Sequence, residues 1–211
     1  AYMAAAFYKK PANSMIMIGV TGTKGKTTTT YMIEKILNSA GINTGLIGSI
    51  EIKYNGITKT NSNTTPEPLT LWETLSDMKQ NGVKAVVMEV SSQGLKMERV
   101  SGIVFDYAIF TNLSRDHIGA CEHADMEEYR ACKTRLFSMC RHGIFNKDDK
   151  NEFKIQTIVK NINTKNTNVI LGDKNIVITS NDNFRELNFG TWEGRVFQDV
   201  KAEYPEQHYN L

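Results

Sequence analysis

The stretch that decides the fold is Gly19-Val20-Thr21-Gly22-Thr23-Lys24-Gly25-Lys26-Thr27-Thr28-Thr29. An apolar run, Met15-Ile16-Met17-Ile18, precedes it and predicts a buried strand. Behind it, apolar residues recur at the spacing of one helical face: Ile33, Ile36, Leu37 and Ala40. A strand, a glycine-rich loop and a helix form a cradle for phosphate, because backbone N–H groups and the helix N-terminus attract anions. The sequence therefore predicts a nucleotide site, with Lys26 on the phosphates and Thr27 on Mg²⁺.

The loop departs from the general phosphate-loop pattern, which has a glycine where this chain has Val20. It is a shorter variant that reads Gly-Thr-x-Gly-Lys-Thr. The alternative is a glycine-rich turn with an exposed lysine, but the strand before the loop and the helix behind it favour a nucleotide. We expect these residues to contact it: Gly22, Thr23, Lys24, Gly25, Lys26, Thr27 and Thr28.

Composition narrows the class of protein. A chain of 211 residues with 40% hydrophobic residues can bury a sizeable core. A net charge of +2 implies no nucleic-acid or membrane partner, and no apolar window approaches the length of a membrane span. Cys121, Cys132 and Cys140 fit neither a disulfide framework nor the spacing of a zinc site. They predict free thiols in a reducing cytoplasm. The sequence contains no motif that indicates the oligomeric state.

Apolar strands alternate with helical patterns from about residue 15 to residue 146, which predicts an α/β domain with a mostly parallel sheet flanked by helices. The expected strands are 15–20, 46–52, 84–90, 107–111 and 143–146. The expected helices are 26–40, 69–81 and 126–140. We expect four parts: 1–14, the end of a preceding domain; 15–149, an ATP-binding domain; 150–183, an Asn/Lys-rich linker or partial element; and 184–211, a small C-terminal α/β fragment.

Two polar motifs are expected at the carboxyl edge of the sheet. Glu89 ends the strand in Met88-Glu89-Val90-Ser91-Ser92, where a carboxylate facing the phosphate loop can coordinate Mg²⁺. The alternative is a solvated glutamate at the end of a strand. The turn Asn63-Thr64-Thr65-Pro66-Glu67-Pro68 can hold an anionic or sugar-linked substrate, although ordinary turns before helices also look like this.

Two further motifs carry a histidine and a lysine. His117, in Thr111-Asn112-Leu113-Ser114-Arg115-Asp116-His117, can ligate a second cation, but magnesium prefers oxygen ligands. Lys133 shares an inward helical face with Tyr129, Leu136 and Phe137. A buried lysine needs a partner, and the alternative is a lysine whose amine reaches out to solvent.

Taken together, these motifs resemble the central, ATP-binding domain of the Mur ligases over about residues 1–149. Within that family they are most similar to the members that add the third peptide residue to UDP-N-acetylmuramoyl-L-Ala-D-Glu. The resemblance implies ATP on Lys26, the loop amides and Asn112, one Mg²⁺ on Thr27 and Glu89, and a second on His117. It also implies that Lys133 is carbamylated and supports the second metal. The dipeptide substrate is expected on Thr64, Thr65, Pro66, Glu67, Ser91 and Arg99.

The implied reaction places Lys26, Lys133 and His117 in catalysis. The substrate carboxylate attacks the γ-phosphate of ATP, and the amine of an amino acid then displaces phosphate from the acyl phosphate. Gln93 stands where the family often has histidine. Because the family's uridine-binding and C-terminal domains are not recognisable, we expect this chain to be incomplete for full activity. The family also implies a bacterial cytoplasmic location and a role in peptidoglycan synthesis.

Residues 184–206 resemble the histidine phosphatases, in which Glu186 would be the proton donor. We do not take Arg141-His142-Gly143 as the phosphohistidine motif, since it is expected at the end of the Lys133 helix and not of a strand. Three alternatives to the ligase stay open. They are a histidine-phosphatase fragment, a folate-type polyglutamate ligase, and an ATP-binding remnant without turnover.

Overall fold

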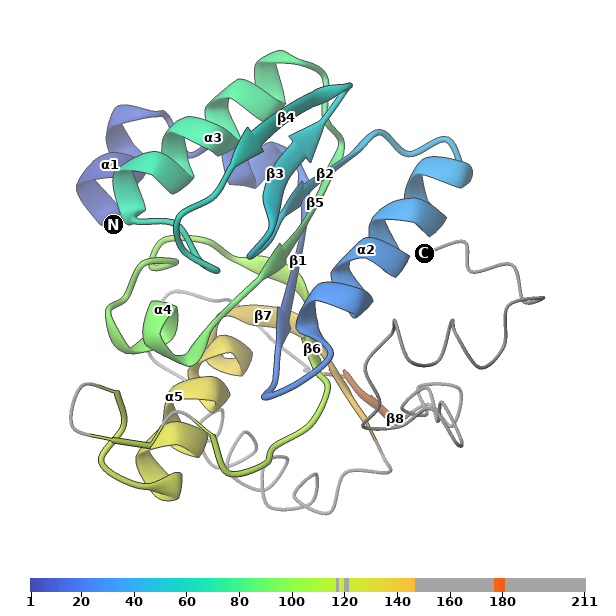
Figure 1. Cartoon of the computed structure of the whole chain (residues 1–211). Helices are drawn as coiled ribbons and strands as arrows, with labels where there is room; N and C mark the ends of the chain where they lie inside the picture. The colour runs from blue at the N-terminus through green and yellow to red at the C-terminus, as the bar shows by residue number, and fades with distance from the viewer. Residues whose placement is uncertain (117, 120–121, 147–176, 181–211) are drawn as a thin grey trace, which may run out of the picture.

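The structure is a computed structural model, and it describes residues 1–116, 118–119, 122–146 and 177–180. Its centre is a sheet whose strands run in the order β4-β3-β2-β5-β1-β6-β7-β8 (Figure 1). The bounds are β1 Ile16–Thr21, β2 Thr44–Ile47, β3 Glu51–Tyr54, β4 Ile57–Thr60, β5 Ala85–Glu89, β6 Phe105–Phe110, β7 Cys140–Phe145 and β8 Val177–Ser180. All neighbours pair in parallel except β2 with β3 and β3 with β4. The predicted mostly parallel α/β sheet is confirmed.

Strand β1 lies between β5 and β6. Strands β2 to β5 lie on one side of β1, and strands β6 to β8 lie on the other, so the direction in which the chain adds strands reverses at β1. In the register, Val20 lies opposite both Glu89 of β5 and Ile109 of β6. Ligands of open α/β sheets bind beyond the carboxyl ends of strands at such a reversal. The loops that follow Thr21, Glu89 and Phe110 therefore meet at one place on the edge of the sheet.

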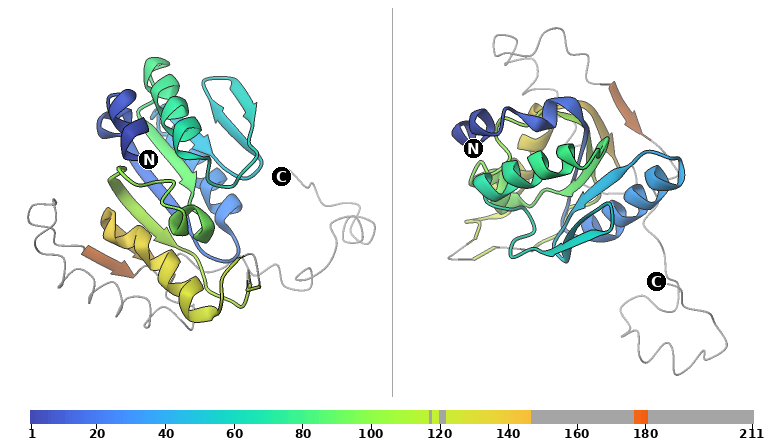
Figure 2. Two further views of the ribbon diagram at one scale, coloured as in Figure 1. Left: turned by 90° about the vertical axis from the view of Figure 1, so that its left-hand side faces the viewer. Right: turned by 90° about the horizontal axis from the view of Figure 1, so that it is seen from above.

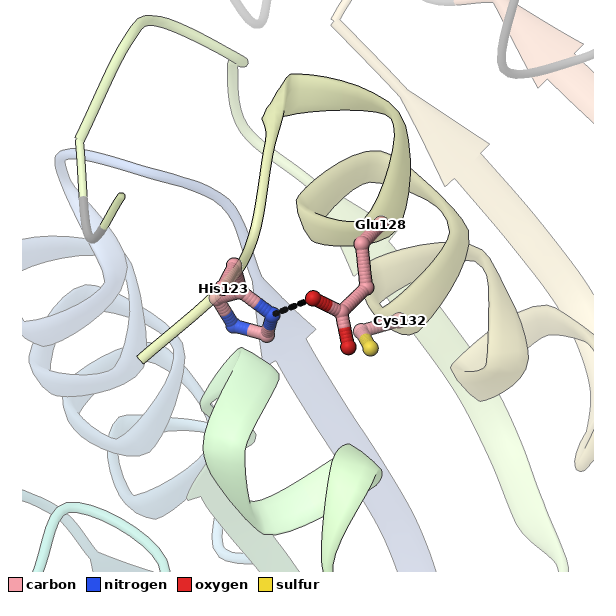
Figure 3. A group of neighbouring side chains, drawn as sticks. All are labelled: His123, Glu128 and Cys132. Atoms are coloured by element: carbon pink, nitrogen blue, oxygen red, sulfur yellow. Dashed lines mark ion pairs between the residues drawn. The ribbon is translucent and has the colours of Figure 1, made fainter. Parts of the chain in front are cut away.

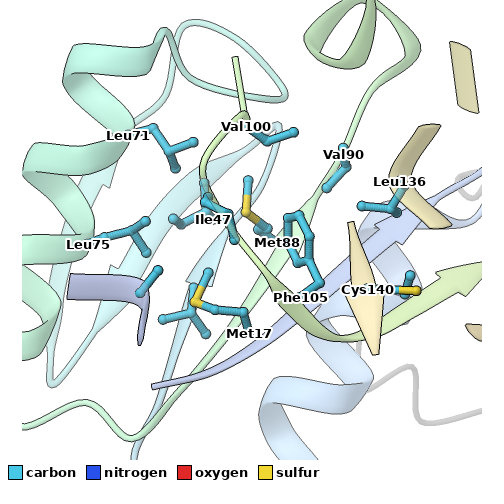
Figure 4. Close-up of a cluster of buried hydrophobic side chains, with 14 of the residues drawn as sticks. Met17, Ile47, Leu71, Leu75, Met88, Val90, Val100, Phe105, Leu136 and Cys140 are labelled. Atoms are coloured by element: carbon cyan, nitrogen blue, oxygen red, sulfur yellow. The ribbon is translucent and has the colours of Figure 1, made fainter. Parts of the chain in front are cut away.

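The helices cover both faces of the sheet (Figure 2). Their bounds are α1 Tyr2–Phe7, α2 Lys26–Ser39, α3 Pro68–Gln80, α4 Ser92–Lys96 and α5 Met126–Ser138, with a 3-10 turn η1 at Pro11–Ser14. Successive β1 residues point to opposite faces, as the pleat requires. Met17 packs with α3 and α5 in the larger core, whereas Ile18 packs with α2 in the smaller one. Figure 4 shows part of the larger core, including Leu71 and Leu75 of α3 and Phe105 of β6.

The prediction of one strand over 46–52 was wrong. The chain leaves β2 at Ile47, turns through Gly48–Ile50 and pairs back on itself as β3, which continues through a tight turn into β4. Asn55 and Gly56 form that turn with φ values of 48° and 77°. Positive φ at both central residues is the signature of a two-residue hairpin turn, and Asn-Gly is its preferred sequence.

The last helix is where it was predicted, but it ends two residues before residue 140 and the following strand begins earlier than expected. Helix α5 ends at Ser138, and β7 begins at Cys140, so Arg141, His142 and Gly143 lie in a strand. The motif follows the Lys133 helix and lies near the start of β7, not at the end of a strand, so our reason for rejecting a phosphohistidine motif there holds. The imidazole of His142 stacks on the ring of Tyr107 in the neighbouring strand, with 5.3 Å between ring centroids. The expected fragment 184–211 and most of 150–183 lie outside the described residues. No helix among the described residues has the length and apolarity to cross a membrane.

Candidate functional site

The loop between β1 and α2 is shaped by two glycines. Gly22 has φ of 150° and Gly25, directly before α2, has φ of 79°. Both values lie where side chains are strained. A Cβ atom on Gly22 would lie 1.9 Å from the hydroxyl oxygen of Thr111. Only glycine therefore allows the loop to pass this closely to the segment that follows β6.

Lys26, the first residue of α2, turns its side chain back over the loop. Its Nζ donates to the carbonyl oxygens of Gly22 at 3.0 Å and Thr23 at 3.2 Å. Burial lowers the pKa of Lys26, and the negative charge of Glu89 partly opposes that effect. The structure places this amine within the glycine loop, as predicted. Its contact with a nucleotide stays a prediction.

The segment after β6 holds the loop from one side. The Asn112 side chain accepts from the Lys24 N–H at 2.9 Å and donates to the Lys24 carbonyl at 3.1 Å. Thr111 donates to the same carbonyl at 2.7 Å, and the Ser114 N–H donates to the Thr23 hydroxyl at 3.0 Å. Asn112 thus positions the loop backbone, and any direct contact with a base or ribose remains a prediction. Thr28, in the first turn of α2, is exposed.

Thr27 and Glu89 come together as the metal prediction requires. The Thr27 hydroxyl donates to Glu89 Oε1 at 3.0 Å. Glu89 is 1% exposed, and its carboxylate also accepts from the backbone N–H and the hydroxyl of Ser49, at 2.9 and 3.1 Å. A Cβ on Gly48 would lie 2.8 Å from Glu89 Oε1, so a glycine there allows the carboxylate its place. Hydroxyl and carboxylate oxygens are the hard ligands that Mg²⁺ prefers, so these residues fit the ion.

The Thr64–Glu67 turn lies against the loop after β5. Thr65 is fully buried, and its hydroxyl donates to the Glu89 carbonyl at 3.1 Å and accepts from the Ser91 N–H at 2.9 Å. Thr64 is only half-buried, and its hydroxyl lies 3.0 Å from the Ser49 hydroxyl. The Ser91 hydroxyl caps α4 by accepting from the Gly94 N–H at 3.0 Å. Of these three side chains, Thr64 and Ser91 are partly exposed and have surface left for a ligand, whereas Thr65 has none.

Arg99 fixes the far side of the same turn. Its Nη2 forms an ion pair with Glu67 at 2.6 Å, and its Nη1 donates to the Thr65 carbonyl at 3.0 Å. Pro66, which lies between Thr65 and Glu67 in the chain, is buried. The structure therefore brings all the predicted substrate residues together, but it uses Arg99 and Glu67 to brace the turn. Their contacts with substrate stay predictions.

Lys133 lies under the glycine loop, on the buried face of α5. It is 1% exposed, and its Nζ donates to the Gly22 carbonyl at 2.8 Å and lies 4.5 Å from the centre of the Tyr129 ring. Burial, with a smaller contribution from the charge of Lys26, lowers the pKa of Lys133 to about 7. The inward orientation predicted from helical spacing is confirmed, and a neutral amine is accessible near neutral pH.

His117 lies outside the described residues. Its neighbour Asp116 reaches the loop and forms an ion pair with Lys24, 3.1 Å from Nζ to Oδ2. Gln93 places its Nε2 in a buried position with no hydrogen-bond partner among the described residues. Sequence reasoning missed Ser49, because the predicted continuous strand over 46–52 left no loop there; the pair Gly48-Ser49 after an apolar run was the available signal.

Comparison with known proteins matches the Mur ligase middle domain over residues 20–191. The chain belongs to the Mur ligase family. A Geobacter sulfurreducens relative named UDP-N-acetylmuramoyl-L-alanyl-D-glutamate–2,6-diaminopimelate ligase is 46% identical over 136 residues, which cover 64% of this chain and 26% of that protein. A Bacillus cereus relative of the same name is 40% identical over 193 residues, covering 85% of this chain and 39% of that one.

A solved structure of a ligase with that name superposes with a TM-score of 0.70 and 25% identity, covering 84% of this Mur ligase chain and 35% of that one. The chain therefore spans about a quarter to two-fifths of the length of the curated relatives named above. The family match runs across residue 150, and the boundary expected there stays a prediction. None of these matches supports the resemblance of residues 184–206 to histidine phosphatases.

Proposed function

We propose that this chain is the ATP-binding part of a ligase that adds an amino acid to UDP-N-acetylmuramoyl-L-alanyl-D-glutamate for peptidoglycan synthesis. The observation that carries the proposal is the contact of Thr27 with Glu89 beside the Lys26 loop. It combines a phosphate cradle with oxygen ligands for a divalent cation. The names of the relatives make 2,6-diaminopimelate the first amino acid to test.

In this proposal each group has one task. Lys26 and the N–H groups of residues 23–27 bind the β- and γ-phosphates. Thr27 and Glu89 hold Mg²⁺, and His117 contributes to a second ion. Bound magnesium supplies charge neutralisation as the substrate carboxylate approaches the γ-phosphate. Thr64 and Ser91 orient the dipeptide so that its carboxylate is in line with the transferred phosphoryl group.

Lys133 is proposed to react with CO₂ and become a carbamate. Only the neutral amine is nucleophilic, and the pKa of about 7 makes that form available at neutral pH. The carbamate carries its charge on the new oxygens and keeps one N–H, which can still donate to the Gly22 carbonyl, so modification requires those oxygens to point away from that acceptor. The adduct is expected as a ¹³C carbamate resonance with labelled bicarbonate, absent in Lys133→Met. No resonance at saturating bicarbonate would contradict this role.

Calorimetry with a non-hydrolysable ATP analogue and Mg²⁺ tests the phosphate site. Lys26→Ala removes a charged donor, so binding is expected to weaken by about 10- to 100-fold. Lys35→Ala is the matched control, because it removes the same charge from an exposed position on the same helix. Equal affinities in the two variants would contradict the assignment of Lys26.

The substrate class needs a separate readout. Phosphate release stimulated by the UDP-muramoyl-dipeptide, and not by a folate polyglutamate, would support the ligase proposed here over the folate-type alternative. Binding of the ATP analogue without stimulation by either acceptor would support an ATP-binding protein without turnover. Stimulation by the folate substrate alone would overturn the proposal.

A further inference from the structure

A second cluster of metal-binding side chain types lies away from the Thr27–Glu89 pair. His123, Glu128 and Cys132 offer an imidazole nitrogen, a carboxylate oxygen and a thiol sulfur that all lie within 4.8 Å of one another (Figure 3). The proposed function uses none of them. The spacing of the cysteines along the chain gave no sign of a zinc site. The fold brings these three groups together from a loop and a helix, and cysteine spacing does not reveal such a combination.

His123 points an unused nitrogen into this cluster. Its side chain is fully buried, and Nδ1 has no hydrogen-bond partner among the described residues. The other nitrogen, Nε2, lies 2.9 Å from the buried Ser92 hydroxyl. When Nε2–H donates to Ser92, Nδ1 carries a free lone pair. This is the arrangement by which proteins orient a histidine ligand, with the second nitrogen held by a hydrogen bond.

Glu128 and Cys132 complete the set from α5. They are four residues apart, so they lie on one face of the helix, one turn from each other. Cys132 is a buried free thiol, 2% exposed. Glu128 Oε2 lies 3.9 Å from His123 Nδ1, too far for a hydrogen bond. Burial lowers the pKa of His123, so this contact is a carboxylate facing a neutral imidazole.

We propose that His123 Nδ1, Glu128 and Cys132 bind a divalent transition-metal cation of the zinc type, with water as the fourth ligand. Tetrahedral zinc holds nitrogen, oxygen and sulfur at about 2.0–2.3 Å, which places its ligands roughly 3.3–3.8 Å apart. The observed ligand atoms lie within 4.8 Å of one another, so the cluster contracts on binding, and Glu128, whose side chain is 34% exposed, is the least buried of the three. Thiolate and imidazole ligands select this class of metal over Mg²⁺.

Charge balance supports the assignment. Binding displaces the thiol proton to solvent, so thiolate and carboxylate together neutralise the cation. Lys96 already holds Glu128 Oε1 at 2.8 Å, and the Ala124 N–H donates to Oε2 at 2.7 Å. These two contacts hold the carboxylate near the imidazole. The bound cation would link His123, in the segment before α5, to Glu128 and Cys132 on that helix.

The site adjoins the proposed nucleotide site through one side chain. The Tyr129 ring lies 5.2 Å from the His123 ring, and its hydroxyl donates to the Thr23 hydroxyl at 3.2 Å. The same ring lies under the Lys133 amine. The two sites nonetheless share no ligand, so cation binding is expected without nucleotide and without Mg²⁺.

Cobalt titration of the whole chain tests the proposal. A Cys121→Ser background leaves Cys132 and Cys140 as the remaining thiols. One equivalent of Co²⁺ is expected to give thiolate-to-cobalt charge-transfer absorption and the strong visible bands of four-coordinate cobalt, and Zn²⁺ should remove both. Glu128→Gln is expected to weaken binding by at least about tenfold. The titration contains no nucleotide, so its failure is distinct from failure of the ligase proposal.

The two cysteines provide the matched control. Cys132→Ala should abolish the charge-transfer band, whereas Cys140→Ala, at an equally buried thiol, should leave it unchanged. Zn²⁺ should also raise the Tm of the Cys140→Ala protein and not that of Cys132→Ala, because a ligand of the folded state stabilises it. No charge-transfer band, or a band that Cys140→Ala removes and Cys132→Ala keeps, would overturn the proposal.

Discussion

Lys26 and Lys133 donate from their side-chain amines to one acceptor, the carbonyl oxygen of Gly22, at 3.0 and 2.8 Å. One amine comes from the start of α2 and the other from the middle of α5. The charge of Lys26 contributes to the lowered pKa of Lys133, although burial is the larger cause. Two amines that crowd one carbonyl favour a multiply charged anion nearby, which a triphosphate provides.

We expect the stability of this protein to rise with pH above neutrality because of Lys133. Its pKa falls from 10.5 in the unfolded chain to about 7 in the folded one. Between these values the unfolded state binds a proton that the folded state does not, so the free energy of unfolding increases with pH. A shift of this size corresponds to at most about 5 kcal/mol, fully present as destabilisation below pH 7.

Urea unfolding at several pH values between about 7 and 9.5, in buffer free of CO₂, measures this effect. Lys133→Met is the comparison, because methionine fills a similar apolar volume and does not titrate. The difference in unfolding free energy between wild type and variant should shrink as pH rises. A difference independent of pH would show that the amine is not desolvated as the structure indicates.

Gly22→Ala should damage the site far more than Gly25→Ala. The added methyl group at Gly22 would lie 1.9 Å from Thr111 Oγ1, whereas at Gly25 it would meet open space and only the strain of φ at 79° remains. We expect about 1 kcal/mol of destabilisation for Gly25→Ala. Gly22→Ala should lose several times more, together with binding of the ATP analogue. Equal losses in thermal unfolding would contradict the close approach of Thr111 to the loop.

The sequence predicted the parts of the fold that repeat a strong pattern. The strand before Gly22 and the helix after Lys26 have clear periodicity, and both are where the loop motif required them. The inward side of α5 followed from the spacing of Tyr129, Lys133 and Leu136. These predictions succeeded because each depends on residues close in the chain.

The parts that failed depend on short signals or on contacts between distant segments. The sequence signal for the hairpin β3–β4 was the dipeptide Asn55-Gly56 alone. Helix α4 has five residues, which is too short to show helical periodicity. The bracing of Thr65 by Arg99 and the contact of Ser49 with Glu89 join residues from different loops. No spacing within one segment encodes such contacts. The cluster of His123, Glu128 and Cys132 was not predicted for the same reason.

Glu89→Gln should remove the magnesium dependence of nucleotide binding while keeping the fold. The amide oxygen of glutamine can still accept from Thr27 and Ser49, so the buried hydrogen bonds survive. The negative charge that attracts Mg²⁺ is lost. We expect affinity for the ATP analogue to fall by about tenfold or more with Mg²⁺ present and to change little in its absence.

Glu34→Gln is the control for that experiment. Glu34 is also a largely buried glutamate, but it lies on α2 and pairs with Lys53 at 3.4 Å. Its substitution should leave the magnesium dependence intact in calorimetry. If both variants lose it equally, the effect belongs to general electrostatics and not to a ligand at Glu89.

Thr65→Val should destabilise the protein, whereas Thr64→Val should not. Thr65 is fully buried, and valine in its place leaves the Ser91 N–H and the Glu89 carbonyl without their present partner. An unsatisfied buried group costs about 1–3 kcal/mol. Thr64 is half-buried, and within the part of the chain that the structure describes its hydroxyl bonds to that of Ser49, so a change within about 0.5 kcal/mol is expected.

Urea unfolding midpoints distinguish the two threonines, and binding of the UDP-muramoyl-dipeptide separates structure from recognition. Thr64→Val should weaken dipeptide binding at unchanged stability, because its hydroxyl has surface free for a ligand. Thr65→Val should lower stability first. If Thr65→Val proved as stable as wild type but no longer bound the dipeptide, its hydroxyl would have to leave Ser91 and contact substrate directly, and the turn would rearrange on binding.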